Sequence, residues 1–176
     1  MVIKAKIMDS GAMDRALTRL SHEIIEKNNG VENVVLIGIK TRGVPIANRI
    51  AEKIKNAYNV TIPVGVLDTS RYRDDRECDV NLIDCTDIPF AVAGKNVVLV
   101  DDVLYTGRTV RAAIEAIIKK GRPSIIELAV MMDRGHRELP IRPDFVGKNV
   151  PTSKAENIKV NLQESDGEES VLLLGN

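Results

Sequence analysis

The sequence predicts an α/β fold: a parallel sheet flanked by helices, followed by a small cap and a C-terminal hairpin. Mainly apolar runs that are too short for helices recur at residues 34–39, 97–100 and 125–131. Such runs are typical of strands buried on both faces. Segments of helical length lie between them. This alternation of strands and helices indicates a parallel sheet with helices on both faces.

Each element has its own signals. The first helix is expected at residues 12–27, with Asp9 or Ser10 as its N-cap and the Asn-Asn-Gly sequence at 28–30 as its end. A second helix is expected at residues 44–58 and a third at 109–120, which Gly121 closes. Besides the three apolar runs, residues 60–67 are predicted to form a strand. The predicted order is therefore helix, strand, helix, strand, strand, helix, strand.

Two further segments depart from this pattern. Residues 68–90 carry crowded charges with weak periodicity, which predicts a long mobile loop or an extended hairpin. Residues 158–162 and 170–174 flank an acidic turn and are expected to form a terminal hairpin. We expect one domain over residues 1–176, in which residues 133–176 supply the cap and the hairpin.

Composition excludes several classes of protein. The chain has 176 residues, of which 44% are hydrophobic and 28% charged, and this is ordinary globular composition. No apolar stretch approaches the length of a membrane-spanning helix. Two cysteines and the absence of a signal-like N-terminus favour a cytoplasmic protein. Aromatic residues make up only 3%, so stacking platforms for single-stranded nucleic acid are scarce.

The net charge of zero conceals segregation along the chain. Residues 1–60 carry 10 basic and 6 acidic groups, and residues 103–161 carry 11 and 6. Residues 61–102 and 162–176 are acidic, with 4 basic and 9 acidic groups in the former and none and 4 in the latter. If the two basic segments meet in the fold, they form one basic face. The alternative, given equal weight, is that the charges are scattered at random along the chain.

Residues 97–109 carry the strongest functional signal. A buried strand ends in Asp101 and Asp102, and a short loop with Thr106 and Gly107 then opens a helix at Thr109. Backbone N–H groups and the positive end of a helix dipole converge there, which suits a phosphate. The adjacent carboxylates can accept hydrogen bonds from vicinal hydroxyls. Together these features predict a site for a ribose 5-phosphate group.

This stretch resembles the signature for phosphoribosyl pyrophosphate (PRPP) of the type I phosphoribosyltransferases. Further segments resemble the PyrR family, whose members regulate pyrimidine operons by attenuation and carry uracil phosphoribosyltransferase activity. These segments are residues 14–24, 38–43, 72–75, 133–141 and 147–153. The resemblance implies a type I phosphoribosyltransferase-like fold and a homodimer or homotetramer. It also implies PRPP, uracil and UMP or UTP as ligands, and pyrimidine operon leader mRNA as a partner.

The resemblance also implies roles for particular residues. Asp101 and Asp102 hold the ribose hydroxyls, and the loop that ends at Thr109 cradles the 5-phosphate. The loop at 40–43 receives pyrophosphate, and Mg²⁺ would bridge substrate oxygens without a direct protein ligand. The full substrate-binding set is Lys40, Thr41, Arg42, Gly43, Asp101, Asp102, Val103, Leu104, Tyr105, Thr106, Gly107, Arg108 and Thr109.

Catalysis is expected to depend on positioning and charge stabilisation, because displacement at the ribose passes through an oxocarbenium-like state. The residues assigned to catalysis are Asp101, Asp102, Arg42 and Arg73. A loop formed by Ser70, Arg71, Tyr72 and Arg73 is expected to close over the pyrophosphate and exclude water. A solvated charged hairpin is the alternative for this loop.

Two basic clusters are candidates for RNA contact. Arg15, Thr18, Arg19 and His22 lie at spacings of three and four, so on a helix they share one face. A solvated helix face is the alternative. The second cluster contains Arg134, His136, Arg137, Arg142, Lys148 and Lys154. If the clusters adjoin, they could hold a folded RNA by its shape, its phosphates and its loop bases.

Two functions remain open from the sequence. In the first, UMP occupies the PRPP site and favours an RNA-binding state, which requires that UMP bind the two states with different affinity. In the second, the chain is a plain uracil or purine salvage phosphoribosyltransferase without an RNA role. A sensor that has lost turnover is disfavoured, because the 40–43 and 101–109 segments are intact.

Overall fold

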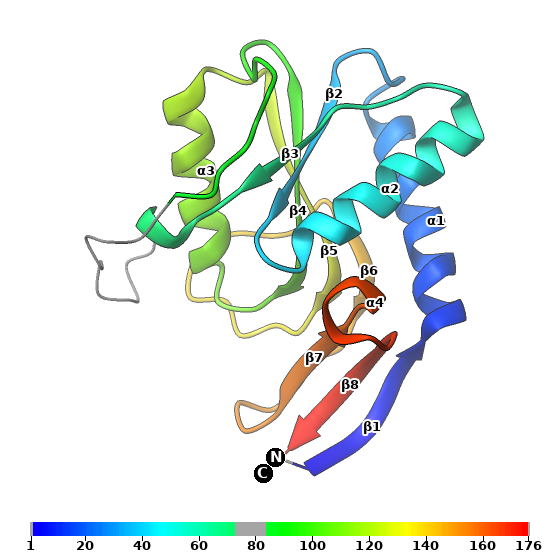
Figure 1. The fold of residues 1–176 in the computed structure, drawn as a ribbon. Helices are drawn as coiled ribbons and strands as arrows, with labels where there is room; N and C mark the ends of the chain where they lie inside the picture. Colours follow the sequence, from blue (N-terminus) through cyan, green and yellow to red (C-terminus); the bar gives the residue numbers. More distant parts are fainter. Residues whose placement is uncertain (1, 73–83, 176) are drawn as a thin grey trace.

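The computed structural model describes residues 2–72 and 84–175 and contains two sheets (Figure 1). The strands are β1 (Val2–Asp9), β2 (Val34–Ile39), β3 (Val64–Leu67), β4 (Asn96–Leu104), β5 (Ile125–Asp133), β6 (Phe145–Asn149), β7 (Asn157–Asn161) and β8 (Ser170–Gly175). The helices are α1 (Ser10–Lys27), α2 (Gly43–Tyr58), α3 (Arg108–Lys120) and the short α4 (Gln163–Asp166), with a 3-10 turn, η1 (Ser70–Tyr72).

The larger sheet is parallel throughout and has the strand order β3-β2-β4-β5-β6. Helices α1 and α2 cover one face and α3 covers the other. Strand β4 divides its side chains between the two layers: Val98 and Val100 join the core under α1 and α2, whereas Val97 and Leu99 pack toward α3. This arrangement confirms the predicted α/β fold with a parallel sheet flanked by helices.

The smaller sheet is antiparallel, with the order β1-β8-β7. The β7–β8 pair is the predicted terminal hairpin, and its acidic turn contains α4. Strand β1 at the N-terminus was not predicted. Its residues 2–6 are exposed, so the sequence shows no buried face there. Figure 1 shows this sheet beyond the carboxyl ends of the parallel strands, with the two chain termini side by side. The single-domain assignment stays a prediction.

Other element boundaries differ modestly from expectation. Strand β3 begins at Val64 rather than residue 60, because Pro63 has no N–H to donate to a ladder. Strand β6 was not predicted, because it is a five-residue edge strand between proline-containing loops. Helix α1 begins two residues earlier than expected, and Asp9 caps it by accepting a hydrogen bond from the Ala12 N–H at 2.8 Å.

The ends of the predicted 68–90 loop lie together. Val66 and Asp87 form an antiparallel bridge, and the Asp68 N–H donates to the Thr86 hydroxyl at 3.1 Å. Between these ends, η1 begins on an Asp68 carboxylate that accepts from both the N–H and the hydroxyl of Ser70. Both ends of the segment are therefore anchored at the carboxyl end of β3.

Candidate active site

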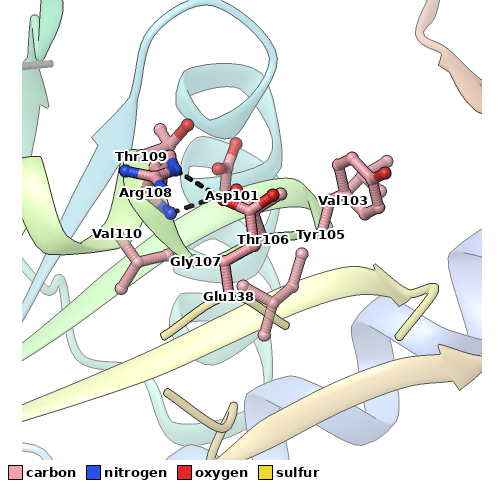
Figure 2. A pocket seen from close by; sticks show the side chains of 10 residues that line it. Asp101, Val103, Tyr105, Thr106, Gly107, Arg108, Thr109, Val110 and Glu138 are labelled. Carbon is pink, nitrogen blue, oxygen red and sulfur yellow. Dashed lines mark hydrogen bonds and ion pairs between the residues drawn. The ribbon is translucent and has the colours of Figure 1, made fainter. Parts of the chain in front are cut away.

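The strand–loop–helix at residues 101–109 lines a cavity of about 300 Å³ (Figure 2). Strand β4 delivers Asp101 to the end of the sheet, where its side chain is buried, and α3 begins after the loop. Gly107 adopts φ +94° directly before the helix, a conformation that side chains other than glycine's disfavour. The first residues of α3 line the cavity, and the N–H groups of a helix N-terminus can bind a phosphate there. The lining residues are Asp101, Val103, Leu104, Tyr105, Thr106, Gly107, Arg108, Thr109, Val110 and Glu138.

The two adjacent carboxylates are held by the backbone at the end of β4. Asp101 accepts a hydrogen bond from the Asp102 N–H at 2.9 Å, and Asp102 accepts one from the Val103 N–H at the same distance. Burial raises the pKa of Asp102, while a hydrogen bond with Asp101 and the positive charge of Arg42 act in the opposite direction. The two carboxylates are therefore fixed by the backbone and lie close to Arg42. In this position they can accept hydrogen bonds from the hydroxyl groups of a ligand.

The predicted pyrophosphate loop follows β2, which pairs with β4, so the two loops are neighbours. Lys40 and Thr41 are exposed and joined by a cis peptide bond, and Arg42 is half-buried. Gly43 fits against β4 so closely that a Cβ would lie 2.2 Å from the Val100 carbonyl oxygen. A glycine at this position lets the loop approach the strand that carries the carboxylates.

The segment after β5 covers the phosphate loop. The N–H groups of Glu138 and Leu139 donate to the Thr106 carbonyl at 3.0 and 3.2 Å. The Glu138 carboxylate accepts from Arg108 Nε at 2.6 Å and lines the cavity. Sequence analysis did not identify Glu138, which is an acidic residue inside a segment read as basic. Its ion pair neutralises Arg108, so an incoming phosphate relies more on N–H donors than on this guanidinium.

The predicted closing loop lies against α3. Tyr72 packs into the core on the α3 side, with Lys119 Nζ 4.7 Å from its ring centroid. Its carbonyl accepts from Arg111 at 2.7 Å. Ser70 and Arg71 are exposed, and Arg73 lies outside the described residues. In this conformation Tyr72 does not cover the pyrophosphate loop.

The RNA candidates on α1 form an exposed stripe that meets the sheet edge. Arg15, Arg19 and His22 are exposed. Arg19 donates to the carbonyls of Val146 and Gly147 at 2.9 and 2.7 Å, next to the exposed Lys148. The structure thus brings α1 and β6 together. The Thr18 hydroxyl donates to the carbonyl one turn earlier, and His22 Nδ1 lies 2.9 Å from the Tyr58 hydroxyl of α2.

The rest of the second basic cluster divides into exposed and internal members. Arg142 and Lys154 are exposed. His136 lies 2.6 Å from the Thr152 carbonyl, and the buried Arg134 donates to Thr152, Asn157 and Glu156. Arg137 also points inward: it donates to the carbonyls of Leu104, Tyr105, Gly135 and Ile141 and pairs with Asp133. Arg137 therefore holds the cap on the 101–109 loop, and Arg134 ties the end of β5 to residues 152–157. Arg142, Lys148 and Lys154 are exposed and remain available to a partner.

This internal role gives a testable expectation for Arg137→Gln. The variant loses several charge-assisted hydrogen bonds to backbone carbonyls, most of them part-buried, so its free energy of unfolding falls by about 2–3 kcal/mol. Its affinity for UMP also falls, because the bonds to Leu104 and Tyr105 shape the site loop. Chemical denaturation and calorimetry measure the two effects, and Arg142→Gln, an exposed neighbour, is the matched control. Wild-type stability and UMP affinity in Arg137→Gln would show that the cap does not depend on this network.

The residues present fit a magnesium ion that is shared with a substrate. Within residues 2–72 and 84–175, no three His, Cys, Asp or Glu side chains gather as a metal site. Asp101 lines the cavity, so a Mg²⁺ ion that arrives with substrate phosphates would be held there through the substrate, with this carboxylate beside it. No helix in the described part of the chain is long and apolar enough to cross a membrane.

These features define an α/β protein with a cavity at a helix N-terminus beside a pair of adjacent carboxylates, an arrangement suited to a phosphorylated sugar. The family model of the phosphoribosyl transferase domain matches residues 5–165. A protein from Clostridioides difficile (strain 630), named "Bifunctional protein PyrR", is 61% identical over 98% of this chain and 99% of its own length. One of the same name from Pelotomaculum thermopropionicum is 58% identical over 97% of this chain and 96% of its own length. The chain belongs to the PyrR family of the phosphoribosyltransferases.

Solved structures agree on the fold. The hypoxanthine phosphoribosyltransferase of Trypanosoma cruzi superposes with a TM-score of 0.76 at 16% identity, covering 98% of this chain and 97% of that one. A hypoxanthine-guanine phosphoribosyltransferase from Bacillus anthracis gives a TM-score of 0.76 at 19% identity, covering 98% and 99%. At these identities the likeness establishes the type I phosphoribosyltransferase fold alone.

Proposed function

We propose that this protein is a uridine-nucleotide-dependent RNA-binding regulator of pyrimidine operon attenuation that also converts uracil and PRPP to UMP and pyrophosphate. The observation that carries the enzymatic part is the adjacency of two loops. The phosphate cradle at 101–109 follows β4, and the 40–43 loop follows the neighbouring strand β2. PRPP carries a 5-phosphate at one end of its ribose and a pyrophosphate at the other, so it spans the two loops.

The reaction forms a bond between a ring nitrogen of uracil and C1′ of the ribose and breaks the bond from C1′ to the pyrophosphate oxygen. The proton of that nitrogen is released to solvent, and pyrophosphate leaves with the bonding electron pair. Asp101 and Asp102 accept hydrogen bonds from the ribose hydroxyls, and Arg42 receives the leaving group. Mg²⁺ carried by PRPP would supply positive charge that stabilises the leaving group. The protein contributes orientation and charge stabilisation.

The regulatory part rests on the exposed stripe formed by Arg15, Arg19 and His22 of α1, together with Lys148 of β6. These side chains can contact RNA phosphates and the edges of unpaired bases. We propose that UMP in the 101–109 site favours the RNA-binding state, which requires that RNA bind the UMP-loaded protein more tightly. A homodimer or homotetramer would repeat the stripe, and the cytoplasm would supply RNA and nucleotides together.

An assay of nucleotide formation tests the enzymatic proposal. The full chain is incubated with PRPP, Mg²⁺ and either uracil or hypoxanthine, and the products are separated by chromatography. We expect UMP from uracil and no nucleotide from hypoxanthine. Purine turnover without uracil turnover would replace the proposal with the salvage alternative, and no turnover of either base would remove the enzymatic role.

A further inference from the structure

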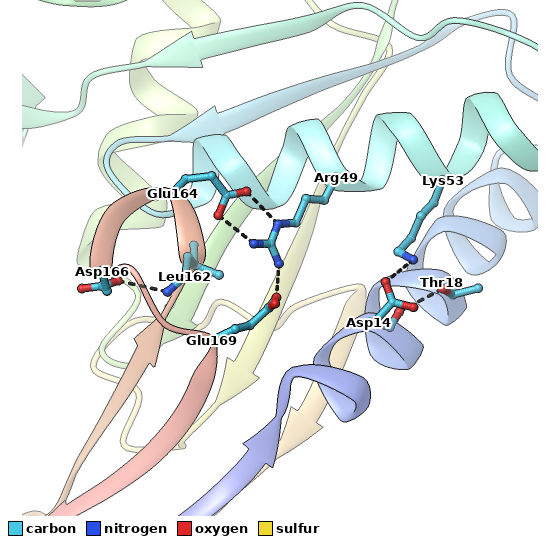
Figure 3. Close-up of polar contacts among 8 residues, drawn as sticks. All are labelled: Asp14, Thr18, Arg49, Lys53, Leu162, Glu164, Asp166 and Glu169. Atoms are coloured by element: carbon cyan, nitrogen blue, oxygen red, sulfur yellow. Dashed lines mark hydrogen bonds and ion pairs between the residues drawn. The ribbon is translucent and has the colours of Figure 1, made fainter.

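The acidic turn of the C-terminal hairpin is docked on α2 and on the pyrophosphate loop by three ion pairs. Arg49 donates to both carboxylate oxygens of Glu164, at 2.8 and 2.7 Å, and also pairs with Glu169 (Figure 3). Arg42 donates from one terminal nitrogen to Asp166 at 2.7 Å. The turn thus contacts the α/β core through two arginines, and only Arg42 belongs to the predicted substrate site.

Asp166 is fixed independently of Arg42. Its second carboxylate oxygen accepts a hydrogen bond from the Leu162 N–H at 3.0 Å, and its own N–H donates to the Leu162 carbonyl at 2.7 Å. The side chain is 15% exposed. The hydrogen bond from Arg42 lowers the pKa of Asp166, so the carboxylate is anionic at neutral pH. The turn therefore presents a fixed negative charge to the guanidinium of the pyrophosphate loop.

Arg42 lies between this carboxylate and the catalytic pair. Its pKa is raised by the hydrogen bond with Asp166 and further by the charges of Asp166 and Asp102. A pyrophosphate at residues 40–43 needs the same guanidinium and brings several negative charges close to Asp166. Two like unit charges about 4 Å apart repel by about 1 kcal/mol even in water. A nucleoside monophosphate has no group at this loop, because its phosphate occupies the 101–109 cradle.

We propose that Asp166 is an internal anionic competitor for Arg42 that weakens the binding of pyrophosphate-bearing ligands relative to nucleoside monophosphates. It is a specificity-determining residue contributed by the C-terminal hairpin. The proposal depends on the proposed function, since that function assigns pyrophosphate to residues 40–43. Its consequence is that the pair between Arg42 and Asp166 persists with UMP and opens with PRPP or pyrophosphate.

Calorimetric titration of Asp166→Asn in the full chain tests this. Asparagine keeps the shape and can still contact Leu162, but it removes the charge. We expect the Kd for pyrophosphate with Mg²⁺ to fall about fivefold and the Kd for UMP to stay within about twofold of wild type. Pyrophosphate binding that is unchanged or weaker in Asp166→Asn overturns the proposal.

Two further variants separate competition from general charge. Glu164→Gln removes the same charge from the same turn but pairs with Arg49, so we expect pyrophosphate affinity close to wild type. An equal gain in Glu164→Gln would show a general field effect and overturn the proposal. In an Arg42→Ala background only the direct charge repulsion remains, so Asp166→Asn should give a smaller gain than in the wild-type background, and a gain of equal size there contradicts competition for Arg42.

A measurement on the wild-type chain keeps the test independent of how the variants fold. The carboxyl carbon of Asp166 is followed by NMR during titration with pyrophosphate and Mg²⁺, and then with UMP. We expect its resonance to shift with pyrophosphate and to stay unchanged with UMP. Pyrophosphate saturation without a shift refutes the competition and leaves the enzymatic proposal intact. Absence of pyrophosphate and PRPP binding by the wild type contradicts the proposed function itself.

Discussion

Gly43→Ala is expected to lower kcat/KM for PRPP by about 100-fold, because a displacement of about 1 Å in a positioning loop has effects of this size. A Cβ on Gly43 would lie 2.2 Å from the Val100 carbonyl oxygen and 3.2 Å from the Asp101 Cα. Both atoms belong to β4, which is hydrogen-bonded to strands on either side. The strand cannot retreat, so the 40–43 loop must move away from the carboxylates. Steady-state kinetics with uracil and PRPP measures the loss.

The stability of the same variant is expected to fall by about 1–3 kcal/mol, the usual cost of overpacking a filled site. Gly11→Ala is the matched control. Gly11 lies in the first turn of α1, and its nearest neighbour is the flexible end of Arg15 at 3.3 Å, so a methyl group is easily accommodated. We expect wild-type kinetics in the control. Gly43→Ala with wild-type kinetics would mean that the loop geometry does not govern catalysis.

The second large effect is expected in RNA binding. Arg15→Gln combined with Lys148→Gln removes two exposed cations, one from α1 and one from β6, which meet where Arg19 bridges the elements. A lost contact between a cation and a phosphate costs about 1.5 kcal/mol, or tenfold in affinity, so the pair should cost roughly 100-fold. The slope of log K against log salt should become less steep by about 2. Filter binding of a leader hairpin at several salt concentrations measures both.

The control for RNA binding is Lys120→Gln, which removes an exposed lysine from α3 on the other face of the sheet. We expect wild-type RNA affinity from this control. We expect wild-type uracil turnover from both the control and the double variant. Arg19→Ala is less informative, because its guanidinium also holds the carbonyls of Val146 and Gly147 at the sheet edge. Equal losses in Lys120→Gln and in the double variant would indicate nonspecific charge attraction instead of a surface on α1 and β6.

Local pattern was sufficient for the centre of the fold. Residues 34–39 and 97–100 are apolar at every position except Gly38, and both lie in strands of the parallel sheet covered on both faces. Strand β1 escaped prediction because its stability depends on pairing with β8, more than 160 residues away along the chain. The sequence pattern of residues 2–9 alone does not indicate a partner strand at that distance. Strand β6 pairs with β5, the strand before it in the chain, and was missed because it is a five-residue edge strand between proline-containing loops.

The candidate site also contains a part that the local sequence pattern predicts and a part that depends on distant contacts. Residues 101–109 form a contiguous motif, so the strand, loop and helix that they form could be predicted from neighbouring residues in the sequence. From the sequence, Arg137 could only be recognised as a basic residue. The fold shows that the carbonyls of four residues accept hydrogen bonds from its guanidinium. Asp166 lies 124 residues from Arg42, and nothing in either local segment indicates that they pair. The residues that line the candidate site were therefore easier to find from the sequence than the residues that restrain them.

The most direct test of the account is filter binding of a pyrimidine operon leader hairpin to the full chain, with and without UMP, at one fixed salt concentration. We expect specific binding that strengthens when UMP is present and weakens in the variant with both Arg15→Gln and Lys148→Gln. RNA affinity that is equal with and without UMP would contradict the coupling of the two sites. Absence of specific binding in both conditions would leave a phosphoribosyltransferase whose basic stripe is solvated surface.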